Sequence, residues 1–393
     1  MEKPMIDSKS FEERIEYYRG IIDDVSFPTV KEWKSKHAGG KVVGMFPVYT
    51  PLELPHAVGM LPVGLFGAGG RVEIDHADSR IQSFVCSIAR STLELGLRDM
   101  TKDFDVLWFP SICDVARNLS GVWSSNFPNQ QVSYIHFPQN MGSPAAITHY
   151  RTELRRLLSN LEELGGKKAT DAALVSSIQA YNQNRALCEK LYAIKRETPW
   201  LLSTYEAYVL LRLATMIPVE EHTKIVQEIL PMIAARDRKP RDYVRVMIEG
   251  SFCEQPPLEL IQVIEEAGCY IVDDDLLMHT RWFHGDVVTN GDPLLGLAES
   301  YIHQSRYSSV RHYGNKPRKE QFVRKIRAGN VDGVIFNAPK FCEPALLDYV
   351  VLKDELEKQG IAYLAFEYEE KMGVFESIRT QVETFVESVL FFS

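Results

Sequence analysis

The amino-acid sequence predicts an α/β protein with two Rossmann-like (flavodoxin-like) parallel-sheet lobes and a helical insert. Short apolar runs of strand length alternate with longer helical patterns in the first and last parts of the chain, whereas the middle has a helical period alone. A chain of 393 residues is also too long for one compact core. We therefore expect N-terminal helices over 1–37, a first α/β lobe over 38–144, a helical bridge over 145–240 and a second α/β lobe over 241–393.

The predicted strands are short runs rich in β-branched and apolar residues, as is typical of strands buried on both faces of a parallel sheet. In the first lobe these runs are Lys41–Val48, Asp105–Phe109 and Val132–Phe137. In the second lobe they are Val244–Glu249, Cys269–Val272, Asp332–Asn337 and Ile361–Glu367. The helical patterns in these lobes are Asp78–Leu97, Leu258–Ala267, Lys319–Ala328 and Ala345–Gln359. The alternation predicts crossover helices between parallel strands.

The middle of the chain, from about Ala145 to Ala235, has a helical period and no convincing strand pattern. Its clearest segment is Ser177–Lys195, in which the apolar residues fall mostly on one helical face. We expect this helix to end before Pro199, because proline disfavours helical geometry in the residue that precedes it. The charged stretch Arg236–Arg241 is then expected to link the bridge to the second lobe.

Charge and hydropathy argue against several classes of partner. The 44 Lys and Arg residues are outnumbered by 53 Asp and Glu residues, and the formal net charge of −9 disfavours a surface dominated by nucleic-acid binding. The first residues are acidic and lack the apolar core of a signal peptide. Proline and glycine interrupt the longest apolar stretch, around Met60–Ala68, so we expect no membrane span. We expect a cytoplasmic protein that binds neither nucleic acid nor a membrane.

The cysteines are scattered, and none of them has CxxC spacing, which argues against a zinc knuckle or a dithiol redox motif. The six are Cys86, Cys113, Cys188, Cys253, Cys269 and Cys342. Two alternatives stay open: buried small apolar side chains, or a metal site assembled from distant segments. Cys188 lies inside a helical pattern and Cys269 begins a predicted strand, so packing explains both of them.

The other four cysteines lie where an α/β protein binds ligands. Cys113, Cys253 and Cys342 each follow a predicted strand, and ligands bind beyond the carboxyl ends of strands in open sheets. Cys86 lies near the start of a predicted helix, and helix N-termini favour a thiolate. Thiols from both lobes that met across a cleft would suit an iron–sulfur cluster or zinc.

Four motifs together resemble the 2-hydroxyacyl-CoA dehydratase / benzoyl-CoA reductase family over nearly the whole chain. They are Tyr49–Pro62 (YTPLELPHAVGMLP), Phe84–Ser91 (FVCSIARS), Ser111–Asp114 (SICD) and Lys340–Pro344 (KFCEP). The last motif is the most specific of them. Two further segments, Glu249–Leu258 and Tyr307–His312, are similar to the substrate-side subunits of class I ATP-dependent benzoyl-CoA reductase. The chain length is similar to that of the shorter of those two subunits, the one designated C.

The resemblance implies a [4Fe–4S] cluster whose iron is bound by three cysteines, with one iron open to a small ligand. Carried over by motif, the ligands are Cys86, Cys113 and Cys342, and Cys253 is the second choice. The implied function is acyl-CoA binding and reductive dearomatisation of an aromatic ring to a cyclohexadiene-carboxyl-CoA. The cluster would supply electrons of very low potential, and iron–sulfur centres reach roughly −700 mV.

The implied enzyme is a heterotetramer of anaerobic aromatic degradation. Its other parts would be a paralogous substrate-side subunit and ATP-hydrolysing iron–sulfur activator subunits, with ferredoxin as the upstream electron donor and benzoyl-CoA as the substrate. ATP and further iron–sulfur clusters would be bound by partners, and the sequence indeed has no GxxxxGK[ST] motif. The glycine run Gly64–Gly70 lacks GxGxxG spacing and is interpreted as a turn.

Glu53 is the candidate catalytic residue. The resemblance implies a substrate-side acid or base here, but a first-turn carboxylate stabilised by the helix dipole, by about 0.3–1 kcal/mol, is an equal alternative. His56 lies in the same segment and would share that role or simply pack. A histidine such as His76, shortly before Cys86, is more often hydrogen-bonded than a cluster ligand.

Two charged segments in the second lobe are weaker candidates. Asp273–Asp275 follows a predicted strand and would bind a metal or substrate, although helix capping and an ion pair with Arg281 are the favoured interpretation. Arg306, Arg311 and His312 lie in an aromatic, polar segment and are candidates for binding CoA phosphates.

Two other functions stay open. One is a 2-hydroxyacyl-CoA dehydratase subunit, a lyase that removes water by a ketyl-radical route with a recycled electron. The other is a non-catalytic paralogous scaffold subunit, which the presence of all three motif cysteines disfavours.

Overall fold

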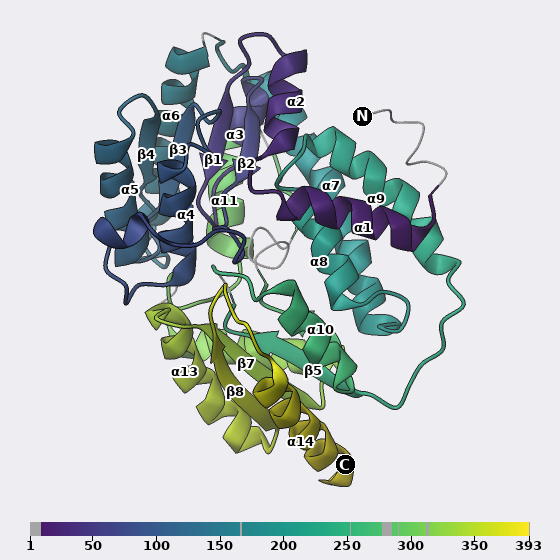
Figure 1. Cartoon of the computed structure of the whole chain (residues 1–393). Helices are drawn as coiled ribbons and strands as arrows, with labels where there is room; N and C mark the ends of the chain where they lie inside the picture. The colour runs from purple at the N-terminus through teal and green to yellow at the C-terminus, as the bar shows by residue number, and fades with distance from the viewer. Residues whose placement is uncertain are drawn as a thin grey trace.

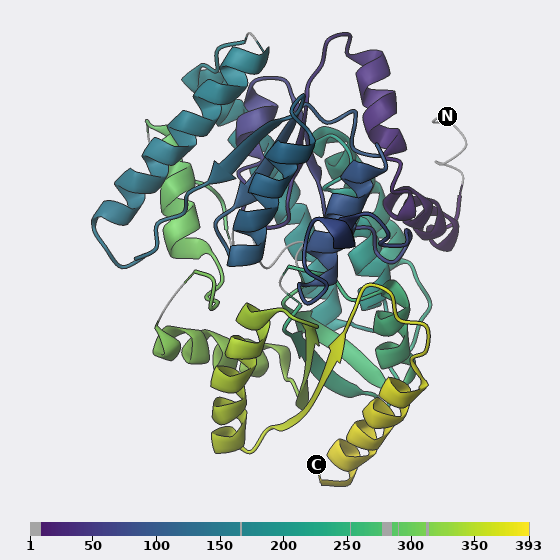
Figure 2. The ribbon, with the colours of Figure 1, turned by 60° about the vertical axis from the view of Figure 1, so that its left-hand side comes forward.

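The computed structural model describes residues 9–165, 167–251, 253–276, 285–289, 291–311 and 314–392. It confirms the predicted α/β class, because two four-stranded parallel sheets are embedded among helices in two lobes. In Figure 1 the first sheet lies above the second, and the helices of residues 171–234 lie to the right. The turned view in Figure 2 separates the two sheets again.

The first sheet has the strand order β2-β1-β3-β4, and every pair in it is parallel. Its strands are β1 Val42–Met45, β2 Leu61–Gly64, β3 Val106–Pro110 and β4 Gln131–Ile135. Strands β1, β3 and β4 lie within or overlap the predicted runs, but β2 was not predicted. Pro62 and Gly64 interrupt the apolar pattern of this segment, so the pattern did not predict a strand. Proline is tolerated here because β2 is an edge strand.

The second sheet has the order β6-β5-β7-β8, which is the same 2-1-3-4 order when its strands are counted along the chain. Its strands are β5 Val244–Glu249, β6 Cys269–Asp274, β7 Gly333–Pro339 and β8 Ala362–Tyr368. All four were predicted to within a few residues. Because the two sheets have the same strand order, the carboxyl ends of corresponding strands occupy equivalent positions in the two lobes. These ends are where α/β sheets bind ligands.

Helices cover both sheets and fill the middle of the chain. The N-terminal helices are α1 Phe11–Asp23 and α2 Pro28–Lys36, and those of the first lobe are α3 Glu53–Ala57, α4 Ser87–Leu97 and α5 Asp114–Asn126. The middle helices are α6 Ala145–Gly165, α7 Asp171–Glu197, α8 Thr204–Leu213 and α9 Val219–Ala234. The remaining helices are α10 Leu258–Glu266, α11 Pro293–Gln304, α12 Asn315–Gly329, α13 Glu343–Gln359 and α14 Glu376–Phe392.

One predicted helix, Asp78–Leu97, is wrong in its first half. The structure has a short 3₁₀ turn at Ala77–Ser79, and α4 begins only at Ser87. Asp78 is instead held by Arg90, whose Nε and Nη2 donate to its two carboxylate oxygens at 2.9 and 2.8 Å. Cys86 therefore directly precedes the first residue of α4, in agreement with its predicted place near a helix start.

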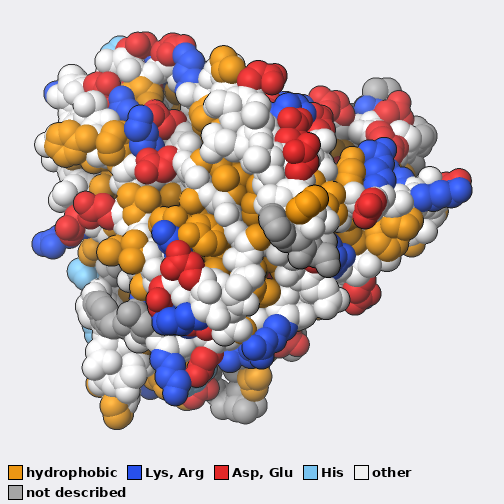
Figure 3. Space-filling view, turned by 90° about the horizontal axis from the view of Figure 1, so that it is seen from below, with side chains coloured by type: hydrophobic (Ala, Val, Ile, Leu, Met, Phe, Trp, Pro, Cys, Tyr) orange, Lys and Arg blue, Asp and Glu red, His pale blue; other side chains and the backbone are white. Residues whose placement is uncertain are grey.

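The middle helices connect the lobes. Helix α7 contacts α3 of the first lobe and β6 of the second, and it ends at Glu197, as the following proline predicts. Helix α11, which comes from the last third of the chain, packs against α6 (Figure 1). None of the helices in the described ranges has the length and apolarity of a membrane crossing. The end of the molecule that carries the second lobe shows acidic, basic and apolar side chains interspersed (Figure 3).

Candidate functional site

Three cysteines occupy the same local position, the residue directly before a helix. Cys86 is the N-cap of α4, Cys113 of α5 and Cys342 of α13. The Sγ atom of Cys113 accepts a hydrogen bond from the backbone N–H of Ala116 at 3.4 Å. Free N–H groups and the positive end of the helix dipole favour negative charge at each of these positions.

These three thiols lie close enough to act on one another electrostatically. Burial raises the pKa of Cys86 well above its ordinary value, and Glu254, Cys342 and Cys113 raise it further. Burial raises the pKa of Cys342 to about 12, with a smaller contribution from Cys113. Burial likewise raises the pKa of Cys113. The thiols are therefore protonated at neutral pH, and a bound metal would be the group that removes their protons.

Thiols are ligands that both iron–sulfur clusters and zinc take. Among the described residues, no three His, Cys, Asp or Glu side chains are already spaced to hold one metal ion. A four-iron cluster requires a wider spacing, because each thiolate binds a different iron atom. Mononuclear zinc draws its ligands to about 2.3 Å and usually takes four of them. Cys253, the second-choice ligand, is buried directly before Glu254.

A buried glutamate, which the sequence did not single out, joins the second lobe to the helix that begins after Cys86. Glu254 Oε1 accepts from the Ser87 hydroxyl at 2.5 Å, and Oε2 accepts from the Ile88 N–H at 2.9 Å. Burial, reinforced by the negative charge of Glu370, raises the pKa of Glu254 to about 8. Glu254 thus caps the first turn of α4 from the opposite lobe.

Glu370 completes this contact between the lobes. Its backbone N–H donates to the Ser87 hydroxyl at 3.2 Å, and burial raises the pKa of its carboxyl to about 7. The glycine run after β2 receives the side chain, since a Cβ on Gly67 would lie 2.0 Å from Glu370 Oε1. Gly67 also has a φ of +72°, so glycine is required there on two grounds. The run is a turn, as interpreted, and it holds a carboxyl from the second lobe.

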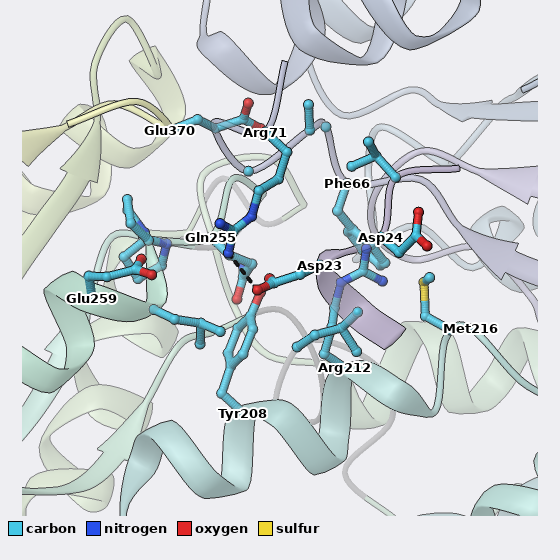
Figure 4. A pocket seen from close by; sticks show the side chains of 18 of the residues that line it. Asp23, Asp24, Phe66, Arg71, Tyr208, Arg212, Met216, Gln255, Glu259 and Glu370 are labelled. Carbon is cyan, nitrogen blue, oxygen red and sulfur yellow. Dashed lines mark hydrogen bonds and ion pairs between the residues drawn. The ribbon is translucent and has the colours of Figure 1, made fainter. Parts of the chain in front are cut away.

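A small pocket lies beside Glu370, between α1, the glycine run, α8 and the start of α10 (Figure 4). Arg71 Nη2 donates to Asp23 Oδ2 at 2.5 Å across it. The guanidinium of Arg212 stacks on the Phe66 ring at 4.0 Å, and burial lowers its pKa to about 10. The pocket is therefore largely filled by its own ion pair and stacked arginine.

Glu53 is the first residue of α3 and has an exposed fraction of 1%. Its Oε1 accepts from Arg185 Nη1 of α7 at 2.8 Å, while Oε2 has no hydrogen-bond partner among the described residues. One carboxylate oxygen of Glu53 is therefore hydrogen-bonded, and the other is buried without a partner among the described residues. His56 is fixed separately, at 2.8 Å from Ser177 Oγ and 2.9 Å from Glu220 Oε1. Among the described interactions, none joins Glu53 to the three thiols.

The two arginines considered for CoA phosphates are buried. Arg306 forms an ion pair with Glu249 and donates to the Asp274 carbonyl at 2.8 Å, so its charge is used within the protein. The Cζ of Arg311 lies 4.5 and 3.7 Å from the ring centroids of Tyr49 and Tyr301. His312 and Arg281 lie outside the described residues.

The remaining candidates have structural partners. Asp273 binds Lys325 at 2.7 Å, and Asp274 binds Lys195 at 2.5 Å. Asp275 accepts from the N–H groups of residues 250 and 251 at 2.9 and 3.0 Å. Asp273 and Asp274 therefore form ion pairs with lysines, and the predicted pairing with Arg281 stays a prediction. His76 Nδ1 lies 2.8 Å from Glu94 Oε1, which supports its role as a hydrogen-bonded residue.

Comparison with known proteins places this arrangement in context. Residues 47–389 match the family model described as 2-hydroxyglutaryl-CoA dehydratase, D-component. The chain is 40% identical to the C subunit of benzoyl-CoA reductase from Thauera aromatica over 95% of this chain and 97% of that protein. It is 31% identical to lactoyl-CoA dehydratase subunit beta of Anaerotignum propionicum over 95% and 99%, respectively. It is 25% identical to (R)-2-hydroxyglutaryl-CoA dehydratase, subunit beta, of Acidaminococcus fermentans over 91% and 94%.

Proposed function

Because the chain belongs to the 2-hydroxyglutaryl-CoA dehydratase D-component family, we propose that it is a subunit of an ATP-dependent benzoyl-CoA reductase. In that reaction two electrons and two protons add to the aromatic ring of a CoA thioester and yield a cyclohexadiene-carboxyl-CoA. The 40% identity to a benzoyl-CoA reductase subunit over almost the full length supports this assignment. The partners would be a paralogous substrate-side subunit and an ATP-hydrolysing activator supplied with electrons by ferredoxin.

The observation that carries the proposal is the set of three thiols at three helix starts. Cys86 and Cys113 come from the first lobe and Cys342 from the second, and together they would hold a [4Fe–4S] cluster. A bound cluster of this type supplies single electrons at low potential. The chain itself contributes helix N-termini that stabilise the thiolates and a buried contact through Glu254 that keeps the lobes together.

Glu53 is the proposed proton-handling residue. Arg185 fixes one carboxylate oxygen, and the other is buried without a partner within the described ranges, so a bound substrate group would supply that partner. Its burial excludes bulk water, which otherwise competes for protons and for low-potential electrons. A positioned carboxyl of this kind is what general acid catalysis requires.

Anaerobic purification with the partner subunits tests the cluster assignment. We expect about four iron and four sulfide per chain for a single cubane cluster. Cys86→Ala, Cys113→Ala and Cys342→Ala should each lose the cluster absorbance, whereas Cys188→Ala, a buried cysteine of α7, should keep it. Unchanged iron content in all three variants would overturn the ligand assignment.

A dehydratase subunit is the second candidate, and the identities to lactoyl-CoA and 2-hydroxyglutaryl-CoA dehydratase subunits favour it. A dehydratase subunit would use the same three thiols as cluster ligands, so an activity assay is needed to distinguish the two candidates. Benzoyl-CoA and a 2-hydroxyacyl-CoA should be compared in the reconstituted complex. Ring reduction with stoichiometric ATP use supports the reductase, and loss of water with catalytic ATP use supports the dehydratase.

A further inference from the structure

A second pocket, of about 700 Å³, lies beyond the carboxyl ends of β3 and β4 and against the start of α6. The proposed chemistry at Glu53 and the three thiols makes no use of it. Its volume falls in the usual range of ligand pockets, about 300–1,000 Å³. Its position is the one at which open parallel sheets bind their ligands.

The lining of this pocket has an unusual charge for so acidic a chain. One arginine and two histidines, Arg117, His136 and His149, line it, and none of its described lining residues is Asp or Glu. The chain as a whole has a net charge of −9. Arg117 has no ion-pair partner among the residues that the structure describes. A pocket with free positive charge and no carboxylate selects an anion.

The start of helix α6 favours the same kind of ligand. The 21-residue helix α6 begins at the pocket, and residues 143, 145 and 146 line it. His149 is the fifth residue of that helix and also lines the pocket. N–H groups and the positive dipole end at a helix start attract phosphate groups, and the nearby side chains add to that attraction.

The inner wall of the pocket lies close to the thiol site, because Ser111, two residues before Cys113, lines it. Tyr134 hydrogen-bonds to Ser111, and burial raises the pKa of its hydroxyl while the charge of Arg117 opposes that shift. Cys113 acts electrostatically on the same hydroxyl, as does Asp114, a carboxylate outside the pocket lining. Arg117 lies one turn beyond Cys113 in the chain, and its N–H donates to the Cys113 carbonyl at 3.2 Å. One end of the pocket is thus solvent-facing and basic, and the other borders a proposed cluster ligand.

We propose that this pocket binds the phosphate-bearing nucleotide end of a CoA thioester, with the acyl arm passing Tyr134 towards Cys113. The inference rests on the proposed function for the identity of the thioester. Arg117 and His149 contact the phosphates. The rings of Tyr134 and His136, 5.0 Å apart and perpendicular, provide an aromatic wall for the adenine.

Binding measured without reductant or ATP tests the pocket on the assembled complex. Benzoyl-CoA should bind at least about tenfold more weakly to Arg117→Gln, since one charge-assisted phosphate contact is lost. His149→Gln should add to that loss. Benzoyl-pantetheine, which lacks the nucleotide, should bind equally to the wild-type and variant complexes. Arg155→Gln, an exposed arginine of α6 outside the pocket lining, is the matched control and should leave benzoyl-CoA affinity unchanged.

Unchanged benzoyl-CoA affinity in the Arg117→Gln/His149→Gln double variant overturns the proposal, as does an equal loss for benzoyl-CoA and benzoyl-pantetheine. A free nucleotide carries the same kind of phosphate groups as the nucleotide end of CoA, so the binding of ADP is measured as well. ADP that binds tightly and is not displaced by CoA would also overturn the proposal. CoA alone should compete with benzoyl-CoA. If CoA binds here by Arg117 but benzoyl-CoA is not reduced, the pocket assignment stands and the reductase assignment fails.

Discussion

The two carboxylate oxygens of Glu53 differ: Arg185 donates to one of them, and the other is buried without a hydrogen-bond partner among the described residues. The ion pair with Arg185 is partly buried, and the short helix α3 that carries Glu53 is anchored to α7 by the Ser177 hydroxyl, which donates to the Glu53 carbonyl at 2.9 Å. The side chain therefore has little rotational freedom. A general acid needs this kind of placement before its acidity matters.

Replacing Glu53 by Gln should lower the turnover of the reconstituted reductase by about 10²–10⁴-fold, because the amide cannot deliver a proton. Iron content and benzoyl-CoA affinity should stay at wild-type values, which separates catalysis from folding. Glu220→Gln, which changes an exposed carboxylate paired with His56, is the control and should keep most of the turnover. Wild-type turnover in Glu53→Gln would remove the residue from the mechanism.

At the scale of elements, one histidine ties three middle helices together. His222 of α9 is fully buried, its Nε2 donates to the Leu210 carbonyl of α8 at 2.9 Å, and its Nδ1 accepts from Asn184 of α7 at 2.7 Å. Burial lowers the pKa of His222 to about 4, from an ordinary value of 6.5. The bundle that connects the lobes is thus built around a neutral imidazole.

Acid should weaken this bundle. Below pH 6.5 the unfolded chain binds a proton at His222 that the folded chain rejects until about pH 4, so the contribution of His222 to stability falls as the pH falls through that window. From pH 7 to pH 5 this contribution to the free energy of unfolding should fall by about 2 kcal/mol, and the difference between the wild type and His222→Gln separates it from the opposite effect of the buried carboxyls. Urea unfolding at the two pH values measures it. His222→Gln should be less stable at pH 7 but should lose less on acidification, and an equal loss in both proteins would contradict the assignment.

Local pattern accounts for most of the elements, and its failures have physical causes. Seven strands and the α7 helix follow from apolar runs, helical period and Pro199. Strand β2 was missed because a proline within a run argues against a strand. The structure tolerates this proline because it lies at a sheet edge, where no hydrogen bond between strands is lost. Three of the four cysteines at strand ends or helix starts became helix N-caps, which strand–loop–helix order already indicates. The Glu254 and Glu370 contacts were not predictable, because they join segments far apart in the chain and one sequence does not encode such pairs visibly.

At the scale of the whole molecule, buried carboxyls hold the two lobes against each other. Glu254 and Glu370 both reach the start of α4 from the second lobe, and both have raised pKa values, about 8 and about 7. A third carboxyl, the half-buried Glu265 of α10, has its pKa raised to about 7 by burial and accepts from the Thr204 N–H of α8 at 2.6 Å, which joins the second lobe to the middle helices. The contact between the lobes is therefore made by acids that hold protons near neutral pH.

Alkaline pH should loosen that contact. Between the ordinary pKa of about 4.5 and the raised values, the folded chain binds more protons than the unfolded chain, so stability falls as the pH rises through 7 and 8. The melting temperature should drop between pH 6 and pH 9. Glu370→Gln mimics the protonated carboxyl and should show a smaller drop, with part remaining because Glu254 and Glu265 still titrate. An identical drop in the variant would show that the lobes are held by other means.

The division of the thiols between the lobes has a consequence for biosynthesis. Roughly 230 residues separate Cys113 from Cys342, and ribosomes add about 5–20 residues per second, so the last proposed ligand emerges about 10–50 seconds after the second. If the first lobe folds as it emerges, two of the three proposed ligands are in place before the third has been made. A cluster on these three thiols could then be completed only after the C-terminal lobe has folded. Cofactor loading would thus serve as a check that the whole chain has been made and folded.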